Sequence, residues 1–373
     1  MTAGIEDVAI RAGVSTATVS RALRGLPNVS ASTRERVLAA ALELDYVVSA
    51  SASSLASGRT STVAAVTPYI ARWFFGQVLC GAESVLREAG FDLLVHAVGT
   101  SERRDRFFAE LPLRRRVDAL MILTLPLDAT EVAALSALRM PVAAVGLAVP
   151  GFPSVHIDDQ RGAMSAVNHL VGLGHRRIAM ISGGGSEPAH FTAADDRRAG
   201  YIAALTAAGI PIEGGYDVDG GYTVRGGEAA MAVLLSRPIL PTAVFAQSDE
   251  MAMGALQAIR KAGLRCPQNI SVVGFDDHEV AELFDLTTVA QPVREQGAMV
   301  ARHLVAALRG VVLPTSTTVA TRLVIRGSTC PPKGAGEASR QREAPADAGR
   351  QVVAPAGRRR GPVPVPKGRQ GAR

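Results

Sequence analysis

The strongest constraint on the fold of this chain is a repeat of short apolar runs separated by segments of helix length. Seven runs between residues 63 and 277 follow this rhythm: VAAVTP, DLLVHAV, ALMILTL, PVAAVGL, RIAMISG, TAVFAQS and SVVGFDD. Such alternation predicts parallel strands flanked by helices. Four runs precede residue 156 and the others follow residue 158. The pattern therefore predicts an α/β domain of two similar lobes, with a ligand cleft at the carboxyl ends of the strands.

The length and composition support this fold class. The chain has 373 residues, which exceeds the usual size of one domain and predicts a small domain beside the large two-lobed one. Hydrophobic residues make up 47% and aromatic residues only 4%. Buried parallel strands are rich in small and branched aliphatic side chains, so this composition favours α/β over all-β.

The formal net charge of +6 comes from the C-terminal segment. Residues 331–373 carry 10 Lys and Arg against 3 Asp and Glu, whereas the rest of the chain carries 30 and 31. The segment is rich in Pro, Gly and Arg and has few bulky apolar residues, so we expect a disordered basic tail. The net charge therefore says nothing about the partners of the folded part.

The sequence lacks the residues that several classes of function would require. The three cysteines, Cys80, Cys266 and Cys330, are far apart and predict reduced, buried thiols rather than a metal site or disulfides. The N-terminus has no signal-peptide pattern and no 18-residue apolar run occurs, so we expect a cytoplasmic protein with no membrane partner. No phosphate loop, metal cluster or nucleophile–base pair is recognisable, so neither catalysis nor a cofactor is expected.

The first 45 residues predict three short helices. A helical apolar face ends at Gly13, Ser15 can cap a second helix that runs to Leu23, and Ser30 can cap a third. The residues expected inside this bundle are Ile5, Val8, Ala9, Ala12, Val19, Ala22, Val37, Ala41 and Leu44. Two short helices joined by a glycine-containing turn have the spacing of a DNA-binding helix-turn-helix.

The second helix would present Ala17, Ser20, Arg21 and Arg24 on its outer face. Arginine can pair with O6 and N7 of guanine, and small side chains let a helix approach base edges in the major groove. The same pattern also fits a three-helix bundle with solvated arginines, and amphipathicity alone leaves both interpretations open.

The literal residues of this segment resemble the LacI/GalR family of repressors. The family pattern DVA…AGVS.ATVSR.L, followed by VS..TRERV, is matched over residues 7–37, and the resemblance extends to about residue 330. It implies that the positions of Thr16, Ala17 and Arg21 read operator bases. The DNA-binding residues expected in the helices are Ser15, Thr16, Ala17, Thr18, Ser20, Arg21, Arg24 and Ser30.

The resemblance also implies a domain order. We expect a helix-turn-helix domain (1–46), a hinge (47–60), a two-lobed periplasmic-binding-protein-like domain for effector binding and dimerisation (61–330), and the tail (331–373).

The hinge of this family becomes a helix on DNA and inserts a leucine into the minor groove, and Leu55 matches that leucine. Packing of Leu55 on the neighbouring domain is the alternative. Val48-Ser49 replaces the usual Pro-Asn, and Ser53 replaces the usual arginine, so operator affinity or spacing is expected to be unusual.

Aromatic residues gather after the first strand of the large domain. The segment TPYIARWFFG (67–76) contains Tyr69, Trp73 and Phe74. Aromatic faces can stack on a sugar ring or on a base, so these residues are candidate effector contacts. Core or lid packing is the alternative.

Polar candidates follow later strands. The resemblance implies that Arg197, in an R.AGY segment, and Asp276, in VVGFDDHE, bind effector hydroxyls. A salt bridge between the lobes is the alternative. Ser248, Asp249 and Gln291 match further effector positions, with Ser248 in place of the usual asparagine.

The resemblance implies a transcription regulator, and a repressor of sugar uptake or catabolism genes in the first instance. It would bind a palindromic operator as a homodimer, with an affinity switched by a sugar or sugar derivative; a nucleobase is the alternative effector. Activation instead of repression, and corepression instead of induction, stay open. An exported sugar-binding transport protein shares the two-lobed architecture but would need a signal peptide and no DNA-binding domain.

Overall fold

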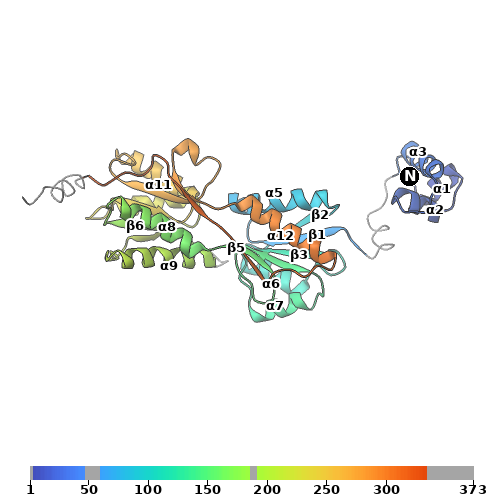
Figure 1. The fold of residues 1–373 in the computed structure, drawn as a ribbon, viewed down its shortest axis with the longest axis horizontal. Coiled ribbons are helices and arrows are strands. Elements are labelled where there is room, and N and C mark those ends of the chain that lie inside the picture. The colour runs from blue at the N-terminus through green and yellow to red at the C-terminus, as the bar shows by residue number, and fades with distance from the viewer. Residues whose placement is uncertain (1–2, 47–58, 185–190, 334–373) are drawn as a thin grey trace, which may run out of the picture. The chain divides into compact units, whose positions relative to one another are not determined.

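The computed structural model describes residues 3–46, 59–184 and 191–333, which Figure 1 draws in colour. Leu55 lies outside the described residues, as do most of the expected hinge and all but the first three residues of the expected tail. Among the helices described, none is long and apolar enough to cross a membrane.

Three short helices form the N-terminal domain: α1 (Ile5–Ala12), α2 (Thr16–Leu23) and α3 (Ala31–Glu43). Gly13 follows α1 with a φ of 65°, in the left-handed region that glycine adopts without strain. The hydroxyls of Ser15 and Ser30 accept 3.2 Å hydrogen bonds from the N–H groups of Thr18 and Thr33. These bonds satisfy backbone donors at the starts of α2 and α3, as the sequence predicted.

The core of this domain consists of small aliphatic side chains. Its buried members are Val8, Ala9, Ala12, Val19, Ala22, Val37, Ala40 and Ala41. Ala40 was not among the predicted core residues, and Ile5 and Leu44 are only partly buried at its edge.

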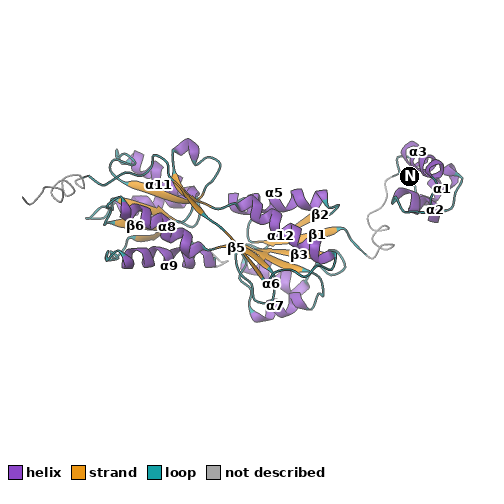
Figure 2. Cartoon of the chain, viewed as in Figure 1, coloured by secondary structure: helices purple, strands orange, loops and turns teal. Residues whose placement is uncertain are grey.

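Lobe 1 is a six-stranded parallel sheet in the order β11-β5-β4-β3-β1-β2. Its strands are β1 (Thr62–Thr67), β2 (Asp92–Ala97), β3 (Ala119–Leu123), β4 (Val142–Val145), β5 (Ser154–Ile157) and β11 (Ser316–Val319). Its helices are α5 (Trp73–Glu88), α6 (Ser101–Glu110), α7 (Ala129–Ser136) and α12 (Val293–Leu308). Figure 2 shows α5 and α12 on one side of this sheet and α6 and α7 on the other.

Lobe 2 repeats this design with the strand order β12-β10-β9-β8-β6-β7. Its strands are β6 (Ile178–Ser182), β7 (Asp217–Asp219), β8 (Ala243–Ala246), β9 (Ser271–Asp276), β10 (Thr287–Ala290) and β12 (Arg322–Val324), of which only β12 is antiparallel to its neighbour. Its helices are α8 (Asp159–Gly172), α9 (Thr192–Ala207), α10 (Val224–Leu235), α11 (Asp249–Lys261) and the 3-10 turn η1 (Glu282–Phe284).

Both faces of each sheet are buried, which explains the continuous apolar runs in the sequence. In β1, Val63 and Ala65 pack with α5 and α12, whereas Ala64 and Val66 pack with α6 and α7. The strands of lobe 2 alternate in the same way between α10 with α11 and α8 with α9. The predicted α/β class and the two similar lobes are confirmed.

The chain passes between the lobes three times: after β5, after β10, and between β11 and β12. The seven predicted strands are β1 to β4, β6, β8 and β9. The sequence did not predict that α12 and β11 return to lobe 1 from the C-terminal part of the chain. This return brings residues that follow β10 to the junction of the lobes.

Candidate nucleic-acid interface and ligand cavity

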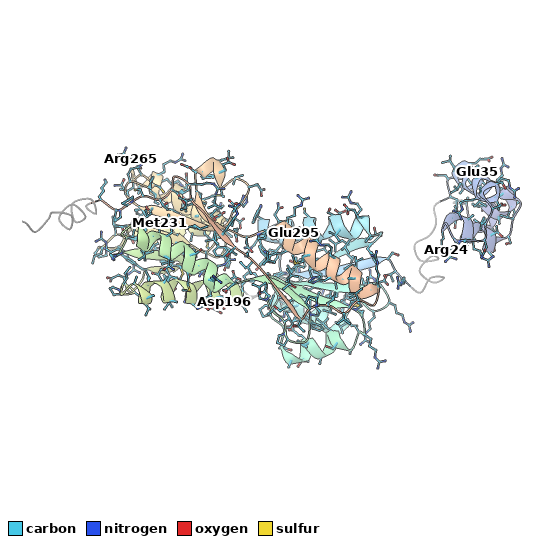
Figure 3. All side chains as sticks on the ribbon, in the orientation of Figure 1. Arg24, Glu35, Asp196, Met231, Arg265 and Glu295 are labelled. Atoms are coloured by element: carbon cyan, nitrogen blue, oxygen red, sulfur yellow. The ribbon has the colours of Figure 1, made fainter. Side chains whose placement is uncertain are left out.

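The outer face of α2 is the candidate nucleic-acid interface. Its predicted DNA-binding residues are exposed (Ser15, Thr16, Ala17, Arg21 and Arg24) or half-buried (Thr18 and Ser20). Arg24, labelled in Figure 3, donates from Nε to the Ser20 carbonyl at 3.3 Å. Within the described part of the chain, no residue forms a hydrogen bond or ion pair with the Arg21 guanidinium. All five of its donors can therefore serve an external acceptor.

Two of the predicted DNA-binding residues, Ser15 and Ser30, are also the N-cap residues of α2 and α3. The Ser15 hydroxyl lies 2.9 Å from that of Thr18, and the Ser30 hydroxyl donates to that of Thr33 at 2.8 Å. Capped helix N-termini attract phosphate oxygens, so these positions suit the DNA backbone better than a base edge. The DNA contacts of α2 and α3 stay predictions.

A cavity that is partly open to solvent lies between the lobes, the kind of position where small-molecule sites often occur. Five of the predicted effector residues line it: Phe74, Arg197, Ser248, Asp276 and Gln291. The other lining residues are Arg72, Thr124, Gly146, Ile157, Asp159, Phe191, Thr192, Ala193, Tyr222, Glu250 and Gln296.

Strand ends supply much of the lining. In lobe 1, Thr124 follows β3 and Gly146 follows β4, and in lobe 2, Ser248, Asp276 and Gln291 lie at or after the ends of β8, β9 and β10. Doubly wound sheets bind ligands at this edge. The fold therefore brings together residues that are far apart in the sequence.

Two of these strand-end residues have strained backbones. Asp276 has a φ of 119° and Thr124 a φ of 45°, and both values lie where side chains with a Cβ are disfavoured. Such strain concentrates at functional sites, because it persists only where the surroundings enforce it.

Arg197 is the centre of a charge network in lobe 2. Its Nε donates to Asp159 Oδ1 at 2.7 Å, while Nη1 donates to the Gln247 carbonyl and lies 3.7 Å from Asp276 Oδ1. The guanidinium also lies 3.7 Å from the centroid of the Phe275 ring. All of these partners belong to lobe 2, so the alternative of a salt bridge between the lobes is wrong.

Burial determines the protonation of this network. Burial raises the pKa of Asp276 to about 7, although the Arg197 charge opposes the rise. Burial likewise raises the pKa of Asp159, again opposed by Arg197. Burial alone would lower the pKa of Arg197, but the two carboxylates raise it above its ordinary value. The cavity therefore holds a permanent cation beside a carboxyl group that ionises near neutral pH.

A chain of amides extends from Asp276 into lobe 1. Gln291 donates from Nε2 to Asp276 Oδ1 at 2.6 Å, and Gln296 donates from Nε2 to Gln291 Oε1 at 3.0 Å. We call these three residues the amide relay. Because Gln296 belongs to α12, the relay connects the charge network of lobe 2 with a helix of lobe 1.

Two predicted aromatic residues pack beside the cavity and do not line it. Trp73 stacks on His278 with ring centroids 4.6 Å apart, and its indole Nε1 donates to Glu279. These contacts join the start of α5 in lobe 1 to the loop after β9 in lobe 2. Tyr69 packs edge to face with Phe191 of lobe 2 at a centroid distance of 6.3 Å.

Asp249 also lies away from the cavity lining. It is fully buried, and its carboxylate accepts hydrogen bonds from the Thr288 hydroxyl at 2.6 Å and from the His278 N–H at 2.8 Å. These bonds connect the start of α11 with β10 and with the loop after β9. Its neighbour Ser248 caps α11 by accepting a 3.3 Å bond from Met251 N–H and also lines the cavity.

Some of the cavity residues that were not predicted carry a signal in the sequence. Thr124 lies near the end of the predicted apolar run ALMILTL, so the rule that ligands bind at strand ends could have found it. Asp159 follows β5, a four-residue strand too short to stand out. Tyr222 and Gln296 had no local signal, because only the tertiary fold brings them to the cavity.

The three cysteines are free, but Cys80 is exposed, and Cys266 and Cys330 are half-buried. The expectation of buried thiols is therefore wrong for Cys80, which lies on an outward-facing turn of α5. Within residues 3–46, 59–184 and 191–333, no cluster of His, Cys and acidic side chains could hold a metal ion.

Comparisons with known proteins agree with this architecture. Residues 4–49 match the family described as bacterial regulatory proteins of the lacI family, and residues 167–329 match the periplasmic binding protein-like domain. The chain is 34% identical over 332 residues to the HTH-type transcriptional repressor CytR of Escherichia coli K12, covering 88% of this chain and 96% of that protein.

Solved structures are also similar over most of the chain. A Lac repressor dimer bound to operator and the anti-inducer ONPF is 32% identical, with a TM-score of 0.79 over 88% of this chain and all of that one. A complex of the regulator CelR with cellobiose is 34% identical, with a TM-score of 0.64 over 87% of this chain and 99% of that one. With a helix-turn-helix followed by two binding-protein-like lobes, this chain belongs to the LacI family of bacterial transcription regulators.

Proposed function

We propose that this chain represses genes of sugar uptake or catabolism by binding a palindromic operator as a homodimer, and that a sugar or sugar derivative in the cavity changes its operator affinity. The observation that carries the proposal is the cavity, where five residues chosen as effector contacts line one space between two lobes. A DNA-binding regulator acts where the chromosome lies, so we also propose a cytoplasmic, nucleoid-associated location.

The DNA part of the proposal depends on α2. Its exposed Arg21 and Arg24 can reach base edges or phosphates while Val19 and Ala22 hold the helix on the bundle. One such helix makes few contacts. A dimer with a twofold axis doubles them and requires an inverted repeat in the DNA.

The effector part depends on the chemistry of the lining. Arg197 offers donors, Asp276 and Gln291 offer acceptors and donors, and the Phe74 ring offers an apolar face. Hydroxyl groups both donate and accept, and sugar C–H faces stack on aromatic rings. A neutral polyol therefore fits this lining.

A nucleoside is the second candidate effector. Phe74 of lobe 1 and Phe191 and Tyr222 of lobe 2 all line the cavity. Rings on both sides of a cavity can contact a flat base, and the ribose of a nucleoside would supply the hydroxyls.

The test uses the full chain in two steps. Selection from random duplexes should return an inverted repeat, and sedimentation should show a dimer on it. A thermal-shift screen should then find a mono- or disaccharide or a ribonucleoside that raises the melting temperature and changes operator affinity. A monomer bound to an asymmetric site, or melting unaffected by every compound, would contradict the proposal.

A further inference from the structure

One buried polar atom at the cavity has no partner. Gln296 is completely buried and lines the cavity, and its Oε1 accepts no hydrogen bond from any described residue. Its neighbour Glu295, labelled in Figure 3, is exposed and pairs with Arg302, so α12 turns from solvent to the cavity wall between these two residues. An unsatisfied buried carbonyl is costly, so its retention at a cavity wall calls for an explanation.

The direction of the amide relay identifies the unpartnered atom as an acceptor. When Asp276 is ionised, its carboxylate only accepts hydrogen bonds, and Gln291 directs its NH2 group toward it. Its Oε1 then faces Gln296 and accepts from the NH2 group of that residue. This orientation engages the NH2 group of Gln296 and leaves its carbonyl oxygen without a partner among the described residues.

Gln296 is also rigidly tied to the rest of lobe 1. A Cβ added to Gly297 would meet the Val78 carbonyl oxygen, and one added to Gly81 would meet the Arg294 carbonyl oxygen. The backbones of α12 and α5 are therefore in direct contact. At the other end of α12, the Leu308 carbonyl accepts a hydrogen bond from Arg59, the first described residue of the expected hinge (47–60).

We propose that Gln296 is the residue through which lobe 1 recognises the effector: a hydroxyl or N–H group of the ligand donates a hydrogen bond to Gln296 Oε1. This inference rests on the proposed function and deepens it, since it requires a ligand with a donor at the α12 side of the cavity. A ligand with only a hydrogen-bond acceptor at this position would place that acceptor against Gln296 Oε1, and neither atom could donate.

The ligand-free arm of the test compares two variants of the full chain. In Gln296→Met, the unpartnered oxygen disappears and Gln291 Oε1 takes its place as the single unsatisfied acceptor, so the melting temperature should stay within about 2 °C of the wild type. In Gln291→Met, Asp276 loses its donor and Gln296 Nε2 loses its acceptor, so that both ends of the Gln296 amide are left without a partner among the described residues. This variant should melt at least about 5 °C lower.

The ligand arm uses cellobiose, D-ribose and uridine, each with deoxy and O-methyl analogues that lack one donor. For the probe that binds best, Gln296→Met should weaken binding by about 5- to 100-fold. On the wild type, one analogue should bind more weakly than its parent probe by a similar factor. On Gln296→Met, the same analogue should bind about as tightly as the parent probe. The matched control is His303→Met, which removes an unpartnered ring nitrogen from the same helix outside the cavity lining and should leave probe affinity unchanged.

Several outcomes would overturn the inference. A large loss of stability in Gln296→Met would show that its carbonyl already has a partner, such as a trapped water. Unchanged probe affinity in that variant, or an equal loss in His303→Met, would remove its role in recognition. If no probe binds the wild type, the proposed sugar or nucleoside effector fails, while the ligand-free arm still decides whether Gln296 Oε1 is unpartnered.

Discussion

Replacing Arg197 with methionine should destabilise the protein far more than the same change at Arg198. The Arg197 side chain is only 6% exposed and neutralises two buried carboxylates, Asp159 and Asp276. The Arg198 side chain is 47% exposed and pairs with Asp217 at 2.8 Å. Arg197→Met and Arg198→Met therefore make the same chemical change at a buried and at a partly exposed position, and each serves as the control for the other.

The expected magnitudes follow from burial. Removing one partner of a buried ion pair costs about 3–5 kcal/mol, because the remaining charge stays in a medium that solvates it poorly. An exposed pair contributes about 0–1 kcal/mol. For a domain of this size, Arg197→Met should therefore lower the melting temperature by about 10 °C, and Arg198→Met by no more than about 3 °C.

The cost of Arg197→Met should also depend on pH. Without the arginine, the pKa values of Asp159 and Asp276 rise further above those of the unfolded chain. Carboxyl groups with raised pKa values stabilise the folded state at low pH, and this stabilisation is lost as the pH rises through the folded pKa. The deficit of the variant should therefore grow from pH 5.5 to pH 8.5.

The assay is urea unfolding of the full chain, followed by circular dichroism at pH 5.5, 7 and 8.5, for the wild type and both variants. Equal costs for Arg197→Met and Arg198→Met, or a cost that is independent of pH, would refute the account of the charge network.

The remaining predictions concern binding. Arg21→Ala should weaken binding to a selected palindrome by about 5- to 150-fold in a gel shift, with an unchanged circular dichroism spectrum; unchanged affinity would remove its base-reading role. Sugar binding measured by calorimetry should weaken as the pH falls from 8 to 6, because the pKa of Asp276 is about 7 and its carboxylate is the better acceptor; Asp276→Asn should flatten this dependence. The fluorescence of Trp73, the single tryptophan, should change when a sugar binds, since its ring stacks on His278 across the lobes; a constant spectrum with a bound sugar would mean that this contact does not move. Deleting residues 331–373 should flatten the salt dependence of nonspecific DNA binding, and a changed sequence preference would show a specific role for the tail.

The N-terminal domain could be predicted from its sequence because local rules determine it. Gly13 ends α1 in the left-handed region, and the hydroxyls of Ser15 and Ser30 cap the next two helices. These are interactions between residues at most four positions apart. Seven strands of the large domain, β1 to β4, β6, β8 and β9, were predictable for a similar reason, since each is an apolar run bounded by turns.

The cavity could be predicted only in part. Ser248, Asp276 and Gln291 lie at strand ends, where the fold class alone locates ligands. Gln296 escaped prediction because it reaches the cavity through the return of α12 to lobe 1, which no local pattern reveals. Trp73 and Asp249 were expected to contact the effector. Trp73 lies at the junction of the lobes, and Asp249 bonds α11 to β10.

Occupation of the cavity should change operator binding, since this coupling is what would make the protein a regulator. The most direct test measures the fluorescence anisotropy of a labelled selected operator titrated with the full chain, with and without a saturating amount of the best thermal-shift compound. The account predicts that the compound changes operator affinity by about 5- to 150-fold, the range of coupling between linked sites. Equal affinities with the compound bound and absent would contradict it.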